Sequence, residues 1–223
     1  MATVQSLMTT CLLRFGQDQT NQRFVDDFYN ALNDAQNDVA TSRSWGFLKT
    51  SANLTLVEST RTVALPSDFM KPYDERGALR YTAPTANVGD TVQLMTMDEW
   101  YANFFDDGTS EGQPTYAYIM GDSLYLSPIP DLTTYTLSMI YYKRPATIAD
   151  TSTTITIPTA YQELLKKMVF RRLQDSGYSS IGELQISDAD IQRLTSGMVR
   201  DDIAKYGGFN MNLQSTTFSR RTV

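Results

Sequence analysis

Histidine is absent from this 223-residue sequence, and cysteine occurs once, as Cys11. Without histidine the chain has no Ser-His-Asp triad, no Cys-His dyad and no histidine-ligated metal. A single cysteine excludes an internal disulfide, which fits a reducing compartment. The sequence has no apolar run of about 18 residues, so we expect no membrane-spanning helix. No Lys or Arg precedes the apolar residues of the N-terminus, so we expect no secretory signal.

Basic residues are fewer than acidic residues. The chain has 19 Lys and Arg against 25 Asp and Glu, which gives a net charge of −6. This balance argues against tight binding to nucleic acid through a general basic surface. The hydrophobic fraction of 41% and the charged fraction of 20% are typical of a globular protein with one well-buried core. Catalysis would have to use carboxylates, lysine, tyrosine or a cofactor.

The stretch 114–145 has the clearest β pattern. Apolar and polar residues alternate in three runs, at 115–120, 123–127 and 133–142. A Gly-Asp pair predicts a tight turn after the first run, and a Pro-Ile-Pro segment has to end the second. We predict an antiparallel meander with one buried face. In the third run the residues on that face are Tyr135, Leu137, Met139 and Tyr141.

Helices are predicted on both sides of this stretch, at 3–14 and 21–42 before it and at 160–175 and 188–206 after it. Asp18 or Thr20 is the expected N-cap of the second helix. Apolar residues recur along that helix at helical spacing, which indicates a face that packs against a partner surface. They are Phe24, Phe28, Leu32, Ala35 and Val39.

Helix-start signals recur later in the sequence. Thr96 with Glu99, and Thr159 with Gln162, have the spacing of capping boxes, and Pro158 in the first turn is the alternative start of the helix at 160–175. Ser187 or Asp188 is the expected cap of the last helix. Between the second helix and the meander we predict short strands and a one-turn helix over 66–70. The strands are expected around Leu54 and Leu56, around Val63 and Leu65, and at 78–82 and 91–94.

This order of elements predicts an α+β fold. The N- and C-terminal helices would pack as a helical layer, with a central antiparallel β-rich insert and an extended C-terminal arm. We expect a helical bundle domain from 1–46 and 157–206, an insert over 47–156 and an arm over 207–223. Trp45 and Phe47 should be buried where the long helix leads into the sheet.

Two residue groups could suggest chemistry. Two acidic pairs near aromatic residues resemble a glycoside-cleaving site: they are Asp98 and Glu99, then Asp106 and Asp107, beside Trp100 and Tyr101. Helix capping by the first pair is the simpler interpretation. The Asp and Asn residues between Asp26 and Asp38 could ligate a hard cation but lack a converging loop, so a solvated helix face is favoured. We predict no catalytic, cofactor or metal residues, and a buried thiol at Cys11.

Several segments taken together resemble the head-to-tail adaptors of tailed bacteriophages, in particular the podovirus type. They are FVDDFYNALNDAQNDVATSRSWGFLKT, VALPSDFMK, PTYAYIMGDSLYLSPIPD, LSMIYYKRPATIAD and IPTAYQELLKKMVFRRL. No segment is as specific as a metal or nucleotide motif, but their order covers residues 24–173. The alternative that stays open is a carbohydrate-binding or glycoside-cleaving module of a phage tail.

The resemblance implies a structural virion protein and not an enzyme. It implies a ring, usually a dodecamer, at the virion neck between the portal protein and a tail or nozzle protein, assembled in the host cytoplasm. DNA would pass through the channel without sequence-specific binding. The residues expected at a subunit interface or in the core are Phe24, Phe28, Leu32, Val39, Trp45 and Phe47.

The C-terminal arm lacks any helical apolar face and follows two glycines, so we expect it to order only on docking to the portal protein. An inert tail is the alternative. The apolar residues expected to fill pockets on the portal are Phe209, Met211, Leu213 and Phe218. Arg220 and Arg221 are expected to meet acidic groups there.

Overall fold

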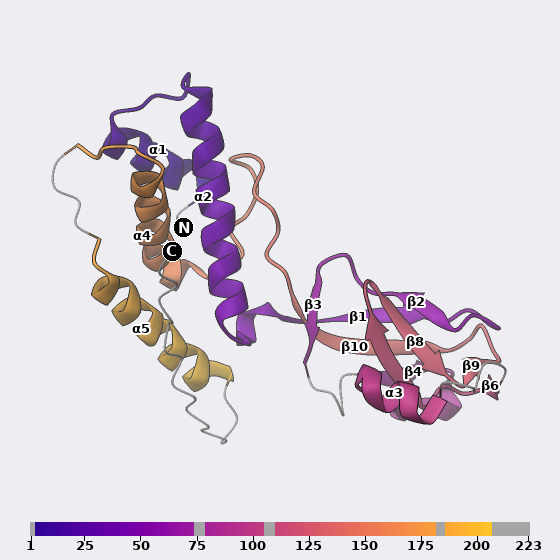
Figure 1. Cartoon of the computed structure of the whole chain (residues 1–223). Coiled ribbons are helices and arrows are strands. Elements are labelled where there is room, and N and C mark those ends of the chain that lie inside the picture. The colour runs from indigo at the N-terminus through magenta and orange to yellow at the C-terminus, as the bar shows by residue number, and fades with distance from the viewer. Residues whose placement is uncertain (1–2, 74–78, 105–109, 182–185, 207–223) are drawn as a thin grey trace.

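The computed structural model describes residues 3–73, 79–104, 110–181 and 186–206. Helices α1, α2, α4 and α5 gather at one end of the molecule, and the strands and α3 lie at the other, joined by a narrow neck (Figure 1). We call these parts the helical unit and the β unit, and define the neck as residues 43–48 and 142–145. The α+β class, with the N- and C-terminal helices packed together, is confirmed. Among the described residues no helix combines the length and apolarity needed to cross a membrane.

The first two helices follow the predicted pattern closely. α1 (Val4–Phe15) begins with a capping box between Thr3 and Ser6 and ends at Gly16, whose φ of 60° suits glycine. α2 (Gln22–Ser42) is capped by Asn21, whose side chain accepts a hydrogen bond from the Phe24 amide at 3.3 Å. The predicted caps Asp18 and Thr20 are therefore wrong. Asp18 instead closes the preceding turn, where its carboxylate accepts from the Thr20 amide at 2.7 Å.

The C-terminal helices differ in how they begin. The capping box predicted for Thr159 and Gln162 is not formed, because a 3-10 turn, η3 (Thr159–Tyr161), occupies this segment. α4 (Gln162–Asp175) follows it without a side-chain cap. α5 (Asp188–Tyr206) is capped as predicted, since the Ser187 hydroxyl accepts from the Asp190 amide at 3.1 Å.

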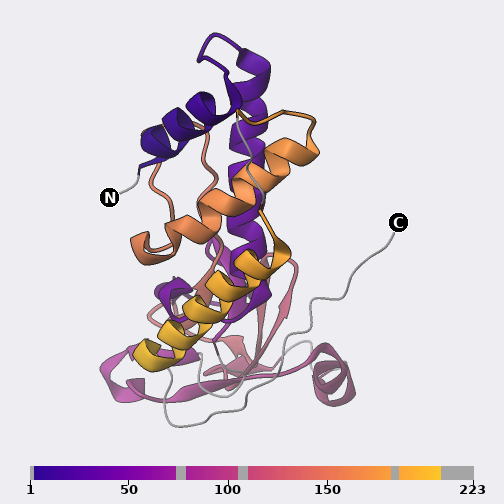
Figure 2. The same cartoon turned by 90° about the vertical axis from the view of Figure 1, so that its left-hand side faces the viewer.

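The core of the helical unit lies mainly between α1, α2 and α4, and Figure 2 shows these helices crossing one another. Phe15 of α1 meets Phe24 of α2 and Phe170 of α4, with ring centroids 6.0 and 5.8 Å apart. α5 adds much less to this core, because Met198 and Asp202 are its only buried residues.

The β unit is a curved mixed sheet with strand order β1-β10-β4-β5-β7-β8-β2, with β3 on the edge of β10. A separate small sheet pairs β6 with β9. The strands are β1 (Lys49–Thr55), β2 (Thr62–Ala64), β3 (Phe69–Pro72), β4 (Leu79–Ala83), β5 (Thr91–Leu94), β6 (Glu111–Gly112), β7 (Tyr116–Met120), β8 (Ser123–Ser127), β9 (Ile129–Pro130) and β10 (Thr136–Lys143). Short 3-10 turns η1 (Gly46–Leu48) and η2 (Thr85–Asn87) precede β1 and β5, and α3 (Met97–Phe104) packs on β7.

Three predictions for this region need correction. The β7–β8 hairpin is confirmed, but β10 does not extend it into a meander; it lies between β1 and β4. The other edge of β8 is taken by β2, which leaves β10 to pair elsewhere. The sheet is mixed and not wholly antiparallel, because β5 and β7 run parallel. The segment 66–70 forms a turn and the start of β3 instead of a one-turn helix, since the edge of β10 offers it ladder partners.

One face of the sheet encloses a second apolar core. Leu54, Leu137 and Leu79 lie on this face in neighbouring strands, and the predicted buried face of β10 is confirmed. The predicted capping box also starts α3: the Thr96 amide donates to Glu99 at 2.9 Å and the Glu99 amide donates to Thr96 at 3.3 Å. The two units thus have separate cores that meet at the neck.

Candidate assembly surfaces

The last turn of α5 docks on the neck. The Asp202 carboxylate, only 5% exposed, accepts a hydrogen bond from the backbone amide of Gly46 at 2.9 Å. Burial raises the pKa of Asp202, while this hydrogen bond and the nearby charge of Arg43 act in the opposite direction. The ring of Tyr206 covers Gly46 so closely that a Cβ there would lie 2.2 Å from the Tyr206 Cγ. The absence of a side chain at Gly46 is therefore what allows α5 to reach the neck.

The predicted core residues at the end of α2 lie next to this contact. Trp45 is 1% exposed, and Phe47 is partly buried with its ring centroid 5.8 Å from that of Trp45. The Arg43 guanidinium lies over the Trp45 ring, 5.9 Å from its centroid. The other residues expected at an interface or in the core are buried in the helical unit; they are Phe24, Phe28, Leu32 and Val39.

A groove of about 380 Å³ opens between α2, α4 and α5. Its apolar lining comes from Val39 and Trp45 on one side, Leu164 and Met168 of α4, and Ile191 of α5. The groove follows the contact of α5 with the other helices. It stays open because the apolar residues of α5 are only partly buried in this contact. The helical unit therefore has an apolar groove next to the neck.

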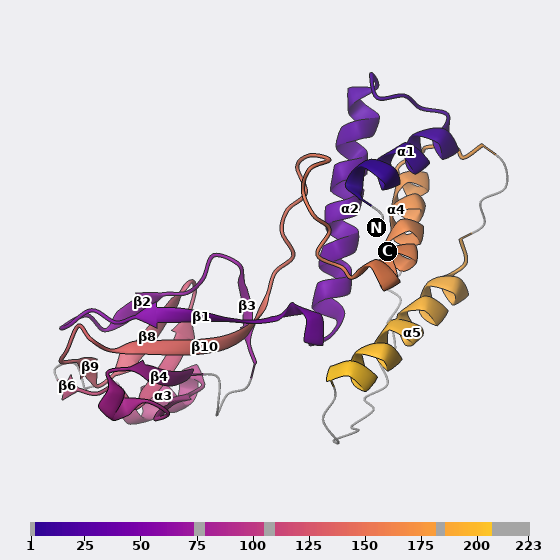
Figure 3. The same cartoon turned by 180° about the vertical axis from the view of Figure 1, so that it is seen from behind.

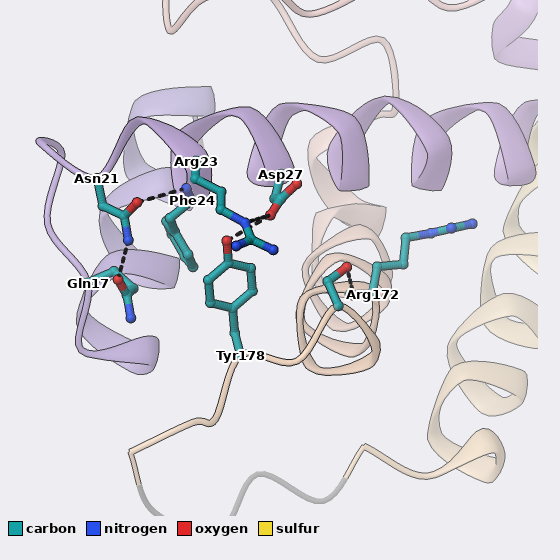
Figure 4. A network of polar contacts seen from close by, with 8 residues as sticks. Gln17, Asn21, Arg23, Phe24, Asp27, Arg172 and Tyr178 are labelled. Carbon is teal, nitrogen blue, oxygen red and sulfur yellow. Dashed lines mark hydrogen bonds and ion pairs between the residues drawn. The ribbon is translucent and has the colours of Figure 1, made fainter.

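The acidic face of α2 is engaged in a polar network. Arg172 of α4 pairs with Asp34 at 3.7 Å and makes a closer contact with Asp38. The Tyr178 hydroxyl donates to Asp27 at 2.7 Å, and Arg23 lies 4.0 Å from the same carboxylate (Figure 4). These carboxylates fix α4 and the following segment against α2. In the described part of the chain no cluster of three or more potential ligands could hold a metal ion.

The acidic and aromatic residues that resemble a glycoside-cleaving site do not form a site open to a sugar. Glu99 is used in the capping box, and the hydrogen bonds from Thr96 lower its pKa. Trp100 is 5% exposed and packs on Tyr118, with ring centroids 4.5 Å apart, so its face is not free for a sugar ring. Tyr101 is exposed, while Asp106 and Asp107 lie outside the described residues.

Cys11 is fully buried in the helical unit, and burial raises its pKa to about 12. The thiol therefore stays protonated at neutral pH and behaves as a small apolar group. The predicted portal-binding residues also lie outside the described residues; they are Phe209, Met211, Leu213, Phe218, Arg220 and Arg221.

Sequence reasoning missed the contact of α5 with the neck. Asp202 continues the spacing Ile191, Leu194 and Met198, which places it on the inward face of the helix. A carboxylate four residues after a buried Met198 was the available signal. Nothing in the sequence around Gly46 indicated which side chain would cover it.

The described chain consists of a helical unit and a projecting β unit, each with its own core. The chain belongs to the SU10 adaptor protein family, whose model matches residues 2–208. It is thus a phage adaptor protein, a member of a structural family. No curated protein matches the sequence.

Proposed function

We propose that this adaptor is the head-to-tail connector of a tailed phage. Copies would form a ring, a dodecamer in the form the resemblance implies, between the portal protein and a tail or nozzle protein at the virion neck. The observation that carries the proposal is the family match over residues 2–208, which includes both units and the neck. No described feature favours the carbohydrate module, because the ring of Trp100 is buried.

The charge of the chain suits a conduit for DNA. A net charge of −6 gives a ring of many copies a strongly negative total charge. A negative lumen repels phosphates, so DNA would slide through it without sequence-specific binding. A chain without histidine also keeps its charge nearly constant between about pH 6 and 8.

The two separate cores support different roles for the helical unit and the β unit. We propose that 1–46 with 157–206 form the helical layer whose flanks meet neighbouring copies, and that 47–156 project from it. The helical core and the β core are separate clusters, and they are joined at the neck. Each unit can then contact a different protein while the neck sets the angle between them.

The arm over 207–223 would attach the ring to the portal. The arm follows Tyr206 in sequence, and the end of α5 is held at the neck by Asp202. Extended segments bind sheet edges through backbone hydrogen bonds, and side chains give specificity. Phe209, Met211, Leu213 and Phe218 would fill portal pockets, and Arg220 and Arg221 would meet acidic groups.

Electron microscopy of portal-containing heads incubated with the purified chain tests the proposal. We expect a ring at the portal vertex, coaxial with the portal. A chain that stays off the vertex, or one that binds there off-axis as a single copy, would overturn it.

A truncated chain ending at Gly207 tests the arm separately. It should keep its circular dichroism spectrum and its urea midpoint but fail to join portal-containing heads. Undiminished attachment of the truncated chain would show that the arm is not the attachment device.

A further inference from the structure

The charges of the β unit are segregated along the sequence. Between Arg80 and Lys143 the chain has no Lys or Arg. The same stretch contains the carboxylates Asp90, Asp98, Glu99, Asp106, Asp107, Glu111, Asp122 and Asp131. The strands before and after this stretch carry the cations. Because β1, β3, β4 and β10 lie together in the sheet, the sequence division becomes a division in space.

The cations share one face of the sheet. Lys49 of β1 and Lys71 of β3 both lie opposite Tyr142 of β10, and Arg80 lies opposite Ser138. Directly opposed residues project from the same face, and alternate residues along a strand do so too. We call Lys49, Lys71, Arg80 and the residues beside them the cationic sheet face. Its other members are Ser51, Asn53, Thr55, Thr82, Thr136, Ser138, Ile140 and Tyr142.

This face points away from the β core. Lys49, Ser51, Asn53 and Arg80 are exposed, whereas Leu54 and the other residues of the opposite face enclose the apolar cluster. The Lys49 ammonium lies 3.4 Å from the centroid of the Tyr73 ring, which is 45% exposed. No Asp or Glu is present on this face in the described residues of β1, β3, β4 and β10.

The α3 side of the β unit carries exposed carboxylates, with one cation nearby, Arg61, whose charge acts on Tyr118. α3 packs on β7 through Trp100 and Tyr118, and it leaves Asp98 and Glu99 exposed. β7 is separated from β10 by β4 and β5, and the sheet curves until its two end strands, β1 and β2, contact each other. α3 lies in front of the sheet in Figure 1 and behind β4 in Figure 3, which shows the unit from behind.

We infer that the cationic sheet face of one copy docks against the α3 side of a second copy, an inference that rests on the proposed ring. A ring requires a heterologous contact, in which two different surfaces of the same chain meet. The two surfaces lie on opposite sides of the β unit and carry opposite charges, which fixes the orientation of neighbouring copies.

A second copy fits this face better than DNA does. The α3 side presents Met97 and Tyr101, 48% and 45% exposed, beside its carboxylates. An apolar and aromatic centre with charged surroundings is typical of a protein interface. The net charge of −6 also opposes the approach of a polyanion to any one cationic patch.

Charge reversal on portal-containing heads tests the inference. Lys49→Glu with Arg80→Glu should lower the number of copies bound per head by about ten-fold or more, because like charges then face each other. Asp98→Lys with Glu111→Lys should have the same effect, since both carboxylates are exposed and Glu111 lies in β6, the element that follows α3 in the chain. The chain with all four changes should regain the ring, because the complementarity is restored with its signs exchanged.

Lys143→Glu with Arg144→Glu is the matched control. It changes the net charge equally, but Lys143 alternates with Tyr142 at the end of β10 and so projects from the opposite face of that strand, and Arg144 lies beyond the end of β10. The control should bind like the unaltered chain. If it also abolishes the ring, net charge alone is responsible and the inference is overturned.

The remaining outcomes separate this inference from the proposed function. Rings of undiminished occupancy from either reversed chain would overturn the inference and leave the connector function standing. An unaltered chain that forms no ring would overturn both. Salt-dependent binding of duplex DNA that is lost in Lys49→Glu with Arg80→Glu, while rings persist, would assign the face to nucleic acid and overturn the inference.

Discussion

The indole N–H of Trp45 donates a hydrogen bond to the backbone carbonyl of Val39, six residues earlier in the chain. Val39 lies in the last turn of α2, where the carbonyls lack partners within the helix. The Ser42 hydroxyl donates to the same carbonyl at 2.7 Å. The chain therefore turns back under the end of α2 as it enters the neck, and Trp45 both satisfies the helix end and fills the core.

Replacement of Trp45 by Ala should lower the free energy of unfolding by about 3–5 kcal/mol, the usual cost of a large-to-small change in a core. Trp45→Phe keeps part of the apolar volume and loses the hydrogen bond to Val39, so it should cost less. Urea denaturation followed by circular dichroism measures both. A midpoint for Trp45→Ala equal to that of the unaltered chain would contradict the prediction.

Gly46→Ala should loosen α5 from the neck, because the added Cβ would overlap the Tyr206 ring. Overpacking of this kind costs about 1–3 kcal/mol. Hydrogen exchange should speed up in the amides of 199–206, while exchange in α1 stays slow.

Tyr206→Ala is the matched variant, because it removes the ring that the new methyl group would meet. Gly46→Ala should then have almost no further effect in the Tyr206→Ala background, and the double-mutant cycle would show strong coupling. If the two substitutions change the free energy of unfolding additively, the residues at 46 and 206 are not in steric conflict in Gly46→Ala.

The order of elements was predictable because periodicity is local. The apolar spacing of Phe24, Phe28 and Leu32 predicts α2 to within a residue, and the alternation of Leu137 and Met139 predicts the buried face of β10. Strand partners were not predictable in this way. β10 lies between β1 and β4, which are distant from it in sequence, and alternation within β10 is the same whichever strand lies beside it.

The same limit applies to the candidate surfaces. Trp45 was expected in the core from its size and from its place after a helix, whereas the contact of Gly46 with Tyr206 joins residues from opposite ends of the chain. The cationic sheet face arises only when the strands carrying Lys49, Lys71 and Arg80 are brought together. Local pattern cannot show such contacts.

Cys11 should resist thiol reagents in the folded protein. Its pKa is raised to about 12 by burial, so at pH 8 almost none of it is thiolate, and the sulfur is also covered. We expect reaction with 5,5′-dithiobis(2-nitrobenzoic acid) at pH 8 to be slow in buffer and fast in urea. Rapid labelling without denaturant would show that α1 opens readily.

The last prediction concerns pH. Burial raises the pKa of Asp202 in the folded chain above the value of about 3.9 for an exposed aspartate. The folded state therefore binds the proton more readily, so the contribution of Asp202 to stability is complete below about pH 3.9 and is lost as the pH rises through the folded pKa. At pH 7 the buried carboxylate is charged and costs stability. Asp18 and Asp190 have lowered pKa values and act in the opposite sense, so only a paired comparison isolates Asp202.

Asp202→Asn provides that comparison, because its amide oxygen can still accept from Gly46 while the side chain carries no charge. Its urea midpoint should exceed that of the unaltered chain at pH 7, and the difference should shrink as the pH falls towards 4. Asp202→Ala is the control: it removes the acceptor and leaves the partly buried Gly46 amide unpaired, so it should destabilise the fold at both pH values. If Asp202→Asn is instead less stable at pH 7, attraction between the ionised carboxylate and Arg43 outweighs the cost of burial.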